Sequence, residues 1–154
     1  ELSPEDLRKI SDAMAFAIRA HDGVERRAGE PYVVHPFRVA LRALMSGMST
    51  KSVVAALLHD VLEDTQTSSE EIAARFGAEV AITVATLTKP VDGTPERDEI
   101  YRRQLLSGTV DARRIKLFDI ADNLADVDLV FPPGRAREYR LKRERLAREL
   151  EESL

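Results

Sequence analysis

Residues 55–65 read AALLHDVLEDT, and the interpretation of the whole chain starts from this stretch. It begins as an apolar helix and then places His59, Asp60, Glu63 and Asp64 close together. At about 100° per residue on an α-helix, these four side chains fall within an arc of roughly 140°. Carboxylates this close repel one another unless a cation lies among them. The stretch therefore indicates either an exposed acidic helix end or one part of a cation-binding site.

Length and composition are typical of one globular domain. The chain has 154 residues, of which 44% are hydrophobic and 32% are charged, so it is long enough to bury a sizeable core. We therefore expect a single domain over residues 1–154. The apolar runs are too short or too charged to span a bilayer, and no signal peptide opens the chain. These features predict a cytoplasmic protein with no membrane partner.

Charge and cysteine content narrow the possible chemistry. The formal net charge of −4 argues against a general nucleic-acid binder. Cysteine is absent, which excludes disulfides, iron–sulfur clusters and thiolate zinc sites. Any metal ion must therefore be held by histidine nitrogen and carboxylate oxygen. The chain has only three histidines, so such a site would need most of them.

Helix signals dominate the rest of the chain. Ser3 followed by Pro4 is typical of a helix start. The stretch 78–88, AEVAITVATLT, contains β-branched residues that favour a strand, but no partner strand is evident, so we expect a helix there. The pattern predicts an all-α bundle of about seven or eight helices. They are expected near residues 4–21, 36–48, 50–63 (capped by Thr50 or Ser52), 69–76, 78–88, 94–106, 110–129 and 135–154.

Two further segments carry polar residues in apolar surroundings. EPYVVHPFRVA places His35 at a helix start, and RRIKLFDIADNLADV places Asp119 and Asn123 on one helix face, four residues apart. An isolated histidine is more often structural than a ligand. Three other acids near the end of the second segment are expected to be solvated surface charges: Asp122, Asp126 and Asp128. The second His-Asp pair, His21-Asp22, we interpret as incidental.

At this point the sequence resembles a known family. His35, the His59-Asp60 pair and Asp119 are similar to the H…HD…D signature of HD-domain metal-dependent phosphohydrolases. The likeness is greatest to the hydrolase domain of Rel/SpoT proteins and to small alarmone hydrolases, including the metazoan SpoT homologue. It is carried by four stretches in the family's order: AHDGVERRAGEPYVVHP, AALLHDVLEDT, FGAEVAITVATLTK and IKLFDIADNL. The resemblance implies a single HD hydrolase domain, without a synthetase domain.

The resemblance also implies roles for individual residues. The metal ligands would be His35, His59, Asp60 and Asp119, holding one Mn²⁺. Glu63 and Asp64 match the family's catalytic acidic pair. The implied substrate-binding residues are Arg26, Arg27 and Asn123. A basic C-terminal helix reaches the substrate in the family, which indicates Tyr139, Arg140 and Arg143 here without fixing their register.

The leading functional hypothesis is hydrolysis of the 3′-pyrophosphate of guanosine alarmones, (p)ppGpp, to GDP or GTP plus pyrophosphate. The family's usual Lys-Leu-Ala-Asp-Arg/Lys is replaced by Lys116-Leu117-Phe118-Asp119-Ile120, which leaves the substrate open. Alternatives are (pp)pApp, the 2′-phosphate of NADPH, or a nucleoside 5′-phosphate. A non-catalytic module that binds nucleotide or a partner helix is a third possibility. The expected partner is a small nucleotide, and a homo-oligomer stays open.

Overall fold

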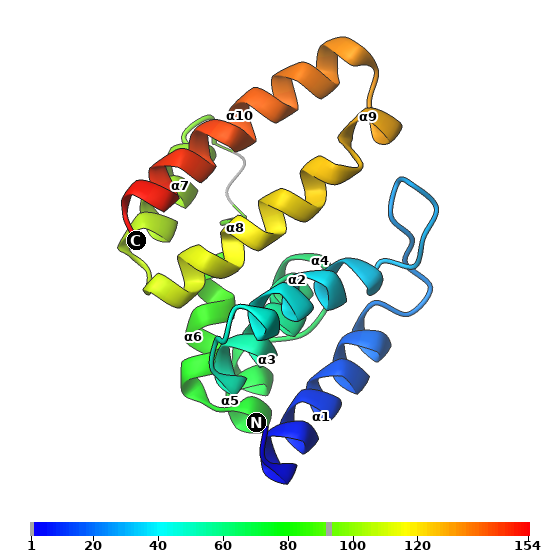
Figure 1. The fold of residues 1–154 in the computed structure, drawn as a ribbon, viewed down its shortest axis with the longest axis vertical. Helices are drawn as coiled ribbons and strands as arrows, with labels where there is room; N and C mark the ends of the chain where they lie inside the picture. Colours follow the sequence, from blue (N-terminus) through cyan, green and yellow to red (C-terminus); the bar gives the residue numbers. More distant parts are fainter. Residues whose placement is uncertain (1, 92–93) are drawn as a thin grey trace.

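The computed structural model describes residues 2–91 and 94–154, and the secondary structure in these ranges is helical apart from one isolated bridge between Glu25 and Pro31. The predicted all-α fold is therefore confirmed (Figure 1). The described helices are α1 (Pro4–Ala20), α2 (Val34–Met45), α3 (Thr50–Leu58), α4 (Val61–Asp64), α5 (Ser69–Phe76), α6 (Ala78–Leu87), α7 (Arg97–Ser107), α8 (Val110–Ala125), α9 (Val127–Val130) and α10 (Pro133–Glu152). Helices α4 and α9 are single turns. None of the described helices is long and apolar enough to cross a membrane.

Side-chain caps start several of these helices where the sequence indicates a start. The Ser3 hydroxyl accepts a hydrogen bond from the Asp6 backbone N–H, and the Asp6 carboxylate accepts one from the Ser3 backbone N–H, so α1 begins with a complete capping box. The predicted cap of α3 at Thr50 or Ser52 is wrong. Ser49 caps this helix, because its side chain accepts from the Ser52 N–H. The cap thus lies just before the first helical residue, as capping geometry requires.

Helix α3 is the centre of the fold. Every residue from Ser52 to His59 is buried, and α1, α2, α6 and α8 all pack against it. The predicted continuous helix over residues 50–63 is wrong, because α3 ends at Leu58 and α4 begins at Val61. His59 and Asp60 occupy the turn between the two helices. Their side chains are therefore placed by a helix junction in the core and not by one straight helix face.

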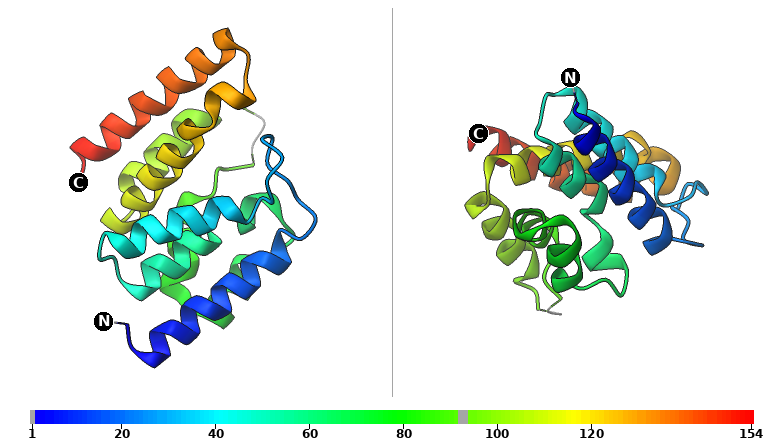
Figure 2. Two further views of the ribbon diagram at one scale, coloured as in Figure 1. Left: turned by 45° about the vertical axis from the view of Figure 1, so that its right-hand side comes forward. Right: turned by 90° about the horizontal axis from the view of Figure 1, so that it is seen from below.

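The other long elements enclose this junction from two sides. Helix α8 runs diagonally through the molecule, with α2 packed on one side of it and α10 on another (Figure 1). Figure 2 shows α1, at the N-terminal end of the chain, far from α10. The predicted helix over residues 110–129 is interrupted at Asp126, where α8 ends and α9 begins. Polar residues on α2, on the α3–α4 turn and on α8 consequently face one another inside the bundle.

Gly108 caps the C-terminus of α7 and lies against α6. A Cβ atom at this position would come within 2.7 Å of the Thr86 Cγ2 methyl. The Thr86 hydroxyl donates to the Ile82 carbonyl oxygen at 2.9 Å, which holds the side chain in place. We therefore expect Gly108→Ala to lower the free energy of unfolding by about 1–3 kcal/mol, the usual cost of overpacking.

A double-mutant cycle measured by urea denaturation checks this prediction. Thr86→Ser removes the methyl group but keeps the hydroxyl, so in this background Gly108→Ala should lose most of its effect. An equal loss of stability in both backgrounds would show that the steric contact with Thr86 is not the cause.

Candidate metal and active site

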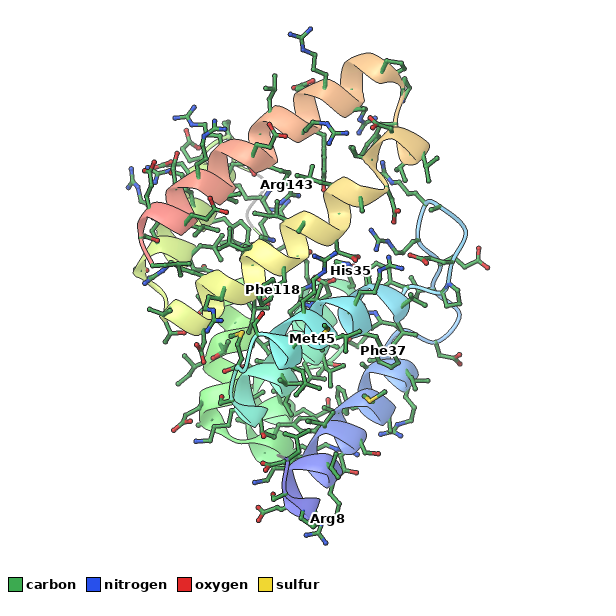
Figure 3. All side chains as sticks on the ribbon, viewed as in Figure 1. Arg8, His35, Phe37, Met45, Phe118 and Arg143 are labelled. Atoms are coloured by element: carbon green, nitrogen blue, oxygen red, sulfur yellow. The ribbon has the colours of Figure 1, made fainter. Side chains whose placement is uncertain are left out.

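Four predicted metal ligands meet inside the bundle. His35 comes from α2, His59 and Asp60 from the α3–α4 turn, and Asp119 from α8. The Nε2 atom of His35 lies 3.0 Å from Asp119 Oδ1 and 3.5 Å from Asp60 Oδ2. The Nε2 atom of His59 lies 3.1 Å from Asp60 Oδ2 and 3.7 Å from Asp119 Oδ1. Figure 3 labels His35 where α2 passes α8.

The spacing of these atoms fits a metal ion. One ligand atom from each of His35, His59 and Asp119 lies within 4.8 Å of the others, and all three residues are buried. Asp60 is half-buried and adds a second carboxylate from the side of the α3–α4 turn. Two imidazole nitrogens with carboxylate oxygens are a donor set that divalent transition metals accept. The predicted residues are thus brought together, while their role as ligands stays a prediction.

Hydrogen bonds on the outer side of both rings turn the Nε2 atoms inward. Nδ1 of His35 lies 2.7 Å from Asp122 Oδ2, and Nδ1 of His59 lies 2.8 Å from the Ala56 carbonyl oxygen. A carbonyl oxygen only accepts, so Nδ1 of His59 carries the proton and its Nε2 keeps the lone pair when the ring is neutral. Within the described residues this buried Nε2 makes no hydrogen bond, although Asp60 Oδ2 lies 3.1 Å away. A cation between the two atoms would give both of them a partner.

The electrostatics of the cluster favour positive charge between the two carboxylates. Burial lowers the pKa of His59, but the nearby Asp60 and Asp119 outweigh it and raise that pKa well above its usual value. Conversely, burial raises the pKa of Asp119, but Lys116 and the two histidines hold it well below its usual value. Both shifts have one physical cause, because each carboxylate is stabilised by positive charge beside it. A proton on an imidazole or a metal ion would supply that charge.

Asp119 is oriented by its own helix. Its Oδ2 accepts a hydrogen bond from Lys116 Nζ at 2.6 Å, and its Oδ1 accepts one from Asn123 Nδ2 at 2.6 Å. The Lys116 side chain is buried and its ammonium lies 5.2 Å from the centre of the Tyr101 ring. Residues three and four positions apart are neighbours on a helix face. The segment KLFDIADN therefore positions the carboxylate with residues that flank it in sequence.

The predicted acidic pair lies one turn beyond the ligands and is exposed. Glu63 and Asp64 are on α4, immediately after the turn that carries Asp60. Glu63 Oε2 accepts a hydrogen bond from the Lys89 backbone N–H at 3.0 Å, which ties α4 to the segment after α6. On the other side, the Tyr32 hydroxyl donates to Asp60 Oδ2 at 2.8 Å. The pair is thus exposed beside a cluster of largely buried side chains.

The predicted substrate residues fall into two groups. Arg26 points to α8, where its guanidinium donates to Asp122 Oδ2 at 2.9 Å and to Asn123 Oδ1 at 3.1 Å. Arg27 is exposed and its guanidinium lies 5.1 Å from the centre of the Phe131 ring. Arg26 and Asn123 therefore border the cluster, while Arg27 lies at a separate aromatic surface.

The C-terminal helix α10 supplies the other side of that aromatic surface. The rings of Tyr139 and Phe131 are 5.3 Å apart, and the Arg143 guanidinium lies 4.9 Å from the centre of the Tyr139 ring. Arg140 instead pairs with Asp128, with 2.8 Å between Nη2 and Oδ2. The three α10 residues indicated by the sequence are thus separated. Tyr139 and Arg143 line one surface with Arg27, whereas Arg140 pairs with Asp128.

Sequence reasoning missed several residues that border the cluster. Asp122, expected to be solvated, is only 2% exposed and bonded to His35. His21, interpreted as incidental, is buried with its ring 4.8 Å from that of Tyr32. Helical spacing places Asp122 about 60° from Asp119 around α8. This proximity to Asp119 was a sequence signal that Asp122 lies near the cluster. The hydrogen-bond partners of Asp122, however, lie 84 or more positions away in the sequence, and no local pattern points to them.

Comparisons with known proteins agree with this geometry. Residues 13–151 match the HD domain family. The chain is 42% identical over 125 residues to a guanosine-3′,5′-bis(diphosphate) 3′-pyrophosphohydrolase of Aquifex aeolicus, which covers 79% of this chain and 18% of the relative. It is 34% identical over 143 residues to the bifunctional (p)ppGpp synthase/hydrolase SpoT of Escherichia coli, covering 87% of this chain and 20% of the relative. The chain thus spans about a fifth of the length of these curated relatives.

A solved structure extends the comparison to the whole fold. It is that of a metazoan ortholog of SpoT, described as a protein that hydrolyzes ppGpp and plays a role in starvation responses. The two chains superpose with a TM-score of 0.80 at 27% sequence identity, covering 99% of this chain and 86% of the other. With the family match over residues 13–151, and with His35, His59 and Asp119 of the signature gathered in one buried cluster, this chain belongs to the HD-domain family.

Proposed function

We propose that this chain hydrolyses the 3′-pyrophosphate of guanosine alarmones, converting ppGpp and water to GDP and pyrophosphate, with Mn²⁺ as its metal. One observation carries the proposal: the ligand atoms of His35, His59 and Asp119 converge within 4.8 Å, and an exposed acidic pair lies one turn away. The names of relatives such as the Aquifex aeolicus and Escherichia coli proteins support the choice of substrate.

The residues present fit a divalent ion. His35 Nε2, His59 Nε2, Asp60 and Asp119 would hold it, and the orphaned Nε2 of His59 supports this assignment. When bound, the ion would polarise a phosphoryl oxygen and lower the pKa of water at its open positions. Around it, the hydrogen bonds of Lys116 and Asn123 hold Asp119 in one orientation. Such outer hydrogen bonds orient ligands and tune their basicity.

The acidic pair would accept the proton of the attacking water. Glu63 is held by the Lys89 N–H through one oxygen, Oε2, which leaves its other oxygen for a water molecule. In this role Glu63, assisted by Asp64, orients the water and accepts its proton as the phosphorus–oxygen bond to the 3′ oxygen breaks. Arg27 would supply donors for a phosphate group or a flat surface for the base, and Arg26 and Asn123 would border the reacting phosphate.

A metal-dependent substrate panel tests the proposal. We expect purified protein with Mn²⁺ to release pyrophosphate and GDP from ppGpp, and EDTA to stop the release. Absence of release with Mn²⁺, Mg²⁺, Co²⁺ and Zn²⁺ in turn would overturn the alarmone assignment. The panel includes pppApp, NADPH and a nucleoside 5′-monophosphate, because Phe118 and Ile120 depart from the family pattern. Binding of ppGpp without turnover of any compound would favour a non-catalytic module.

The departures at Phe118 and Ile120 have a structural explanation. Ile120 is 2% exposed and belongs to the hydrophobic core, and Phe118 packs against the same core. These two side chains thus stabilise packing and offer no hydrogen-bond donor to a phosphate group.

A further inference from the structure

Asp122 is a buried carboxylate that the proposed reaction does not use directly. It is 2% exposed, on α8 between the metal-binding candidate Asp119 and the start of α9. A buried ionised carboxylate is very unfavourable unless several donors surround it. Two arginine guanidinium groups, Arg26 and Arg38, which stay protonated in proteins, donate hydrogen bonds to its carboxylate. These donors keep the carboxylate ionised, and its partners show what it does.

Three side chains from two different segments donate to this carboxylate. Oδ2 accepts from His35 Nδ1 at 2.7 Å, from Arg26 Nη1 at 2.9 Å and from Arg38 Nη2 at 3.2 Å. Oδ1 accepts from Arg38 Nε at 2.7 Å. Arg38 in turn donates to both oxygens of Glu30, at 2.7 and 3.0 Å. The carboxylate thus joins α8 to α2 and to the loop that precedes it.

The bond to His35 decides which nitrogen faces the cluster. An ionised carboxylate only accepts, so Nδ1 of His35 must carry a proton. The lone pair of the neutral ring is then on Nε2, the atom that lies 3.0 Å from Asp119 and 3.5 Å from Asp60. Without Asp122, the ring would be free to rotate or to place its proton on Nε2, and either change removes a ligand.

The bond to Arg26 connects the same carboxylate to the loop of residues 22–33. Arg26 also donates to Asn123 Oδ1 at 3.1 Å, and Asn123 Nδ2 donates to Asp119 Oδ1 at 2.6 Å. Two continuous paths therefore run from Arg26 to the metal-binding candidates: one through Asp122 to His35, and one through Asn123 to Asp119. The loop and the metal-binding candidates are therefore held by the same two residues, Asp122 and Asn123.

We propose that Asp122 is a positioning residue that keeps the proton of His35 on Nδ1 and anchors Arg26 through the same carboxylate, so that the loop of residues 22–33 and the metal-binding residues are held in one arrangement. The proposal rests on the proposed function only in taking His35 as a metal ligand, and it does not depend on the substrate. Loss of this carboxylate therefore weakens metal binding itself, which a purely structural residue would not do.

Asp122→Asn is the variant that tests this, with Asp126→Asn as a matched control. Oδ2 of Asp126 lies 3.9 Å from Arg26 Nη2 and 3.7 Å from Arg38 Nη2, so Asp126 contacts the same two arginines as Asp122. These ion pairs are with arginines and not with His35, and the Asp126 side chain is more exposed than that of Asp122. We expect Asp122→Asn to lower Mn²⁺ affinity about 10- to 100-fold, the usual effect of removing a residue that orients a ligand. Asp126→Asn should change it by less than about twofold, since outer-edge ion pairs contribute little.

Isothermal titration with Mn²⁺ alone measures these affinities on folded protein, without substrate. Equal affinity in Asp122→Asn and the unaltered chain would overturn the proposal, even if the variant melts at a lower temperature. No Mn²⁺ binding by the unaltered chain would overturn both this proposal and the proposed function. Mn²⁺ binding without turnover of ppGpp would overturn the substrate assignment alone, and the comparison of variants would still stand.

A second measurement uses the unaltered chain and avoids any risk of misfolding. In nitrogen-15 spectra of protein loaded with Zn²⁺, a diamagnetic probe, we expect a slowly exchanging Nδ1–H on His35 and a metal shift on its Nε2. A metal shift on Nδ1 of His35, or rapid exchange of its N–H with water, would overturn the proposal. This readout reports the ring orientation that Asp122 is inferred to set.

Discussion

Replacing Glu63 with Gln is expected to lower the turnover of ppGpp at saturating Mn²⁺ by about 10²- to 10⁴-fold, the range for loss of a general base. The amide keeps an oxygen that can accept the Lys89 N–H, so the position of α4 should be preserved. It has no basic carboxylate, however, and cannot take the proton of water. Because Glu63 is exposed one turn beyond the buried cluster, Mn²⁺ affinity should stay within about twofold, as expected for a residue outside the ligand set.

Steady-state kinetics together with Mn²⁺ titration check this prediction. Glu71→Gln, an exposed glutamate near the start of α5, is the control and should have normal turnover. His59→Ala is the opposite case, because it removes a buried nitrogen of the cluster and should lose both metal and turnover. If Glu63→Gln lost Mn²⁺ in parallel with activity, Glu63 would be a ligand. If it kept full turnover, the proton would have another acceptor.

Replacing Lys116 with Met is expected to lower the free energy of unfolding of the metal-free protein by about 3–5 kcal/mol, because it leaves a buried carboxylate without its cation. Lys116 donates to Asp119 at 2.6 Å, and both residues are buried. Methionine keeps an apolar stem over the Tyr101 ring, so the loss is mainly electrostatic. At saturating Mn²⁺ the deficit should shrink, since a cation at His35, His59 and Asp119 restores positive charge beside the carboxylate.

Urea denaturation at neutral pH, with EDTA and with Mn²⁺, measures both parts of this prediction. Lys51→Met is the control, because Lys51 pairs with Glu79 at an exposed site and such pairs contribute about 0–1 kcal/mol. A similar small loss in both variants would show that the Lys116–Asp119 pair is not important for stability. An unchanged deficit at saturating Mn²⁺ would place the metal away from Asp119.

Local chemistry explains why so much of the fold could be predicted. Serine caps, proline at a first helical position and apolar residues at helical spacing act over a few residues, so they can be recognised without a structure. Helix α6 illustrates this, because Val80, Val84 and Leu87 are buried at helical spacing despite their strand-favouring neighbours. The same locality explains why Glu63 and Asp64 were placed one turn after His59 and Asp60.

Errors occurred where distant segments decide the outcome. The helix breaks between α3 and α4 at His59 and Asp60, inside a core where four other helices pack on α3, and no local pattern indicated this break. Asp122 was expected in solvent because aspartate side chains are mostly exposed. It is buried because Arg26, Arg38 and His35, all far away in sequence, converge on it.

The sequence by itself determined most of the helix positions, the family resemblance and the residue types available to a cysteine-free metal site. Only the tertiary structure decided which nitrogen of each histidine faces inward, that Asp122 belongs to the site, and that Arg26 is bonded to α8 while Arg27 lies beside Phe131. The physical reason is the sequence distance between the residues that interact. Helix propensity and capping depend on neighbours a few residues away, whereas the orientation of a buried polar side chain depends on whichever donors the fold brings within about 3 Å of it.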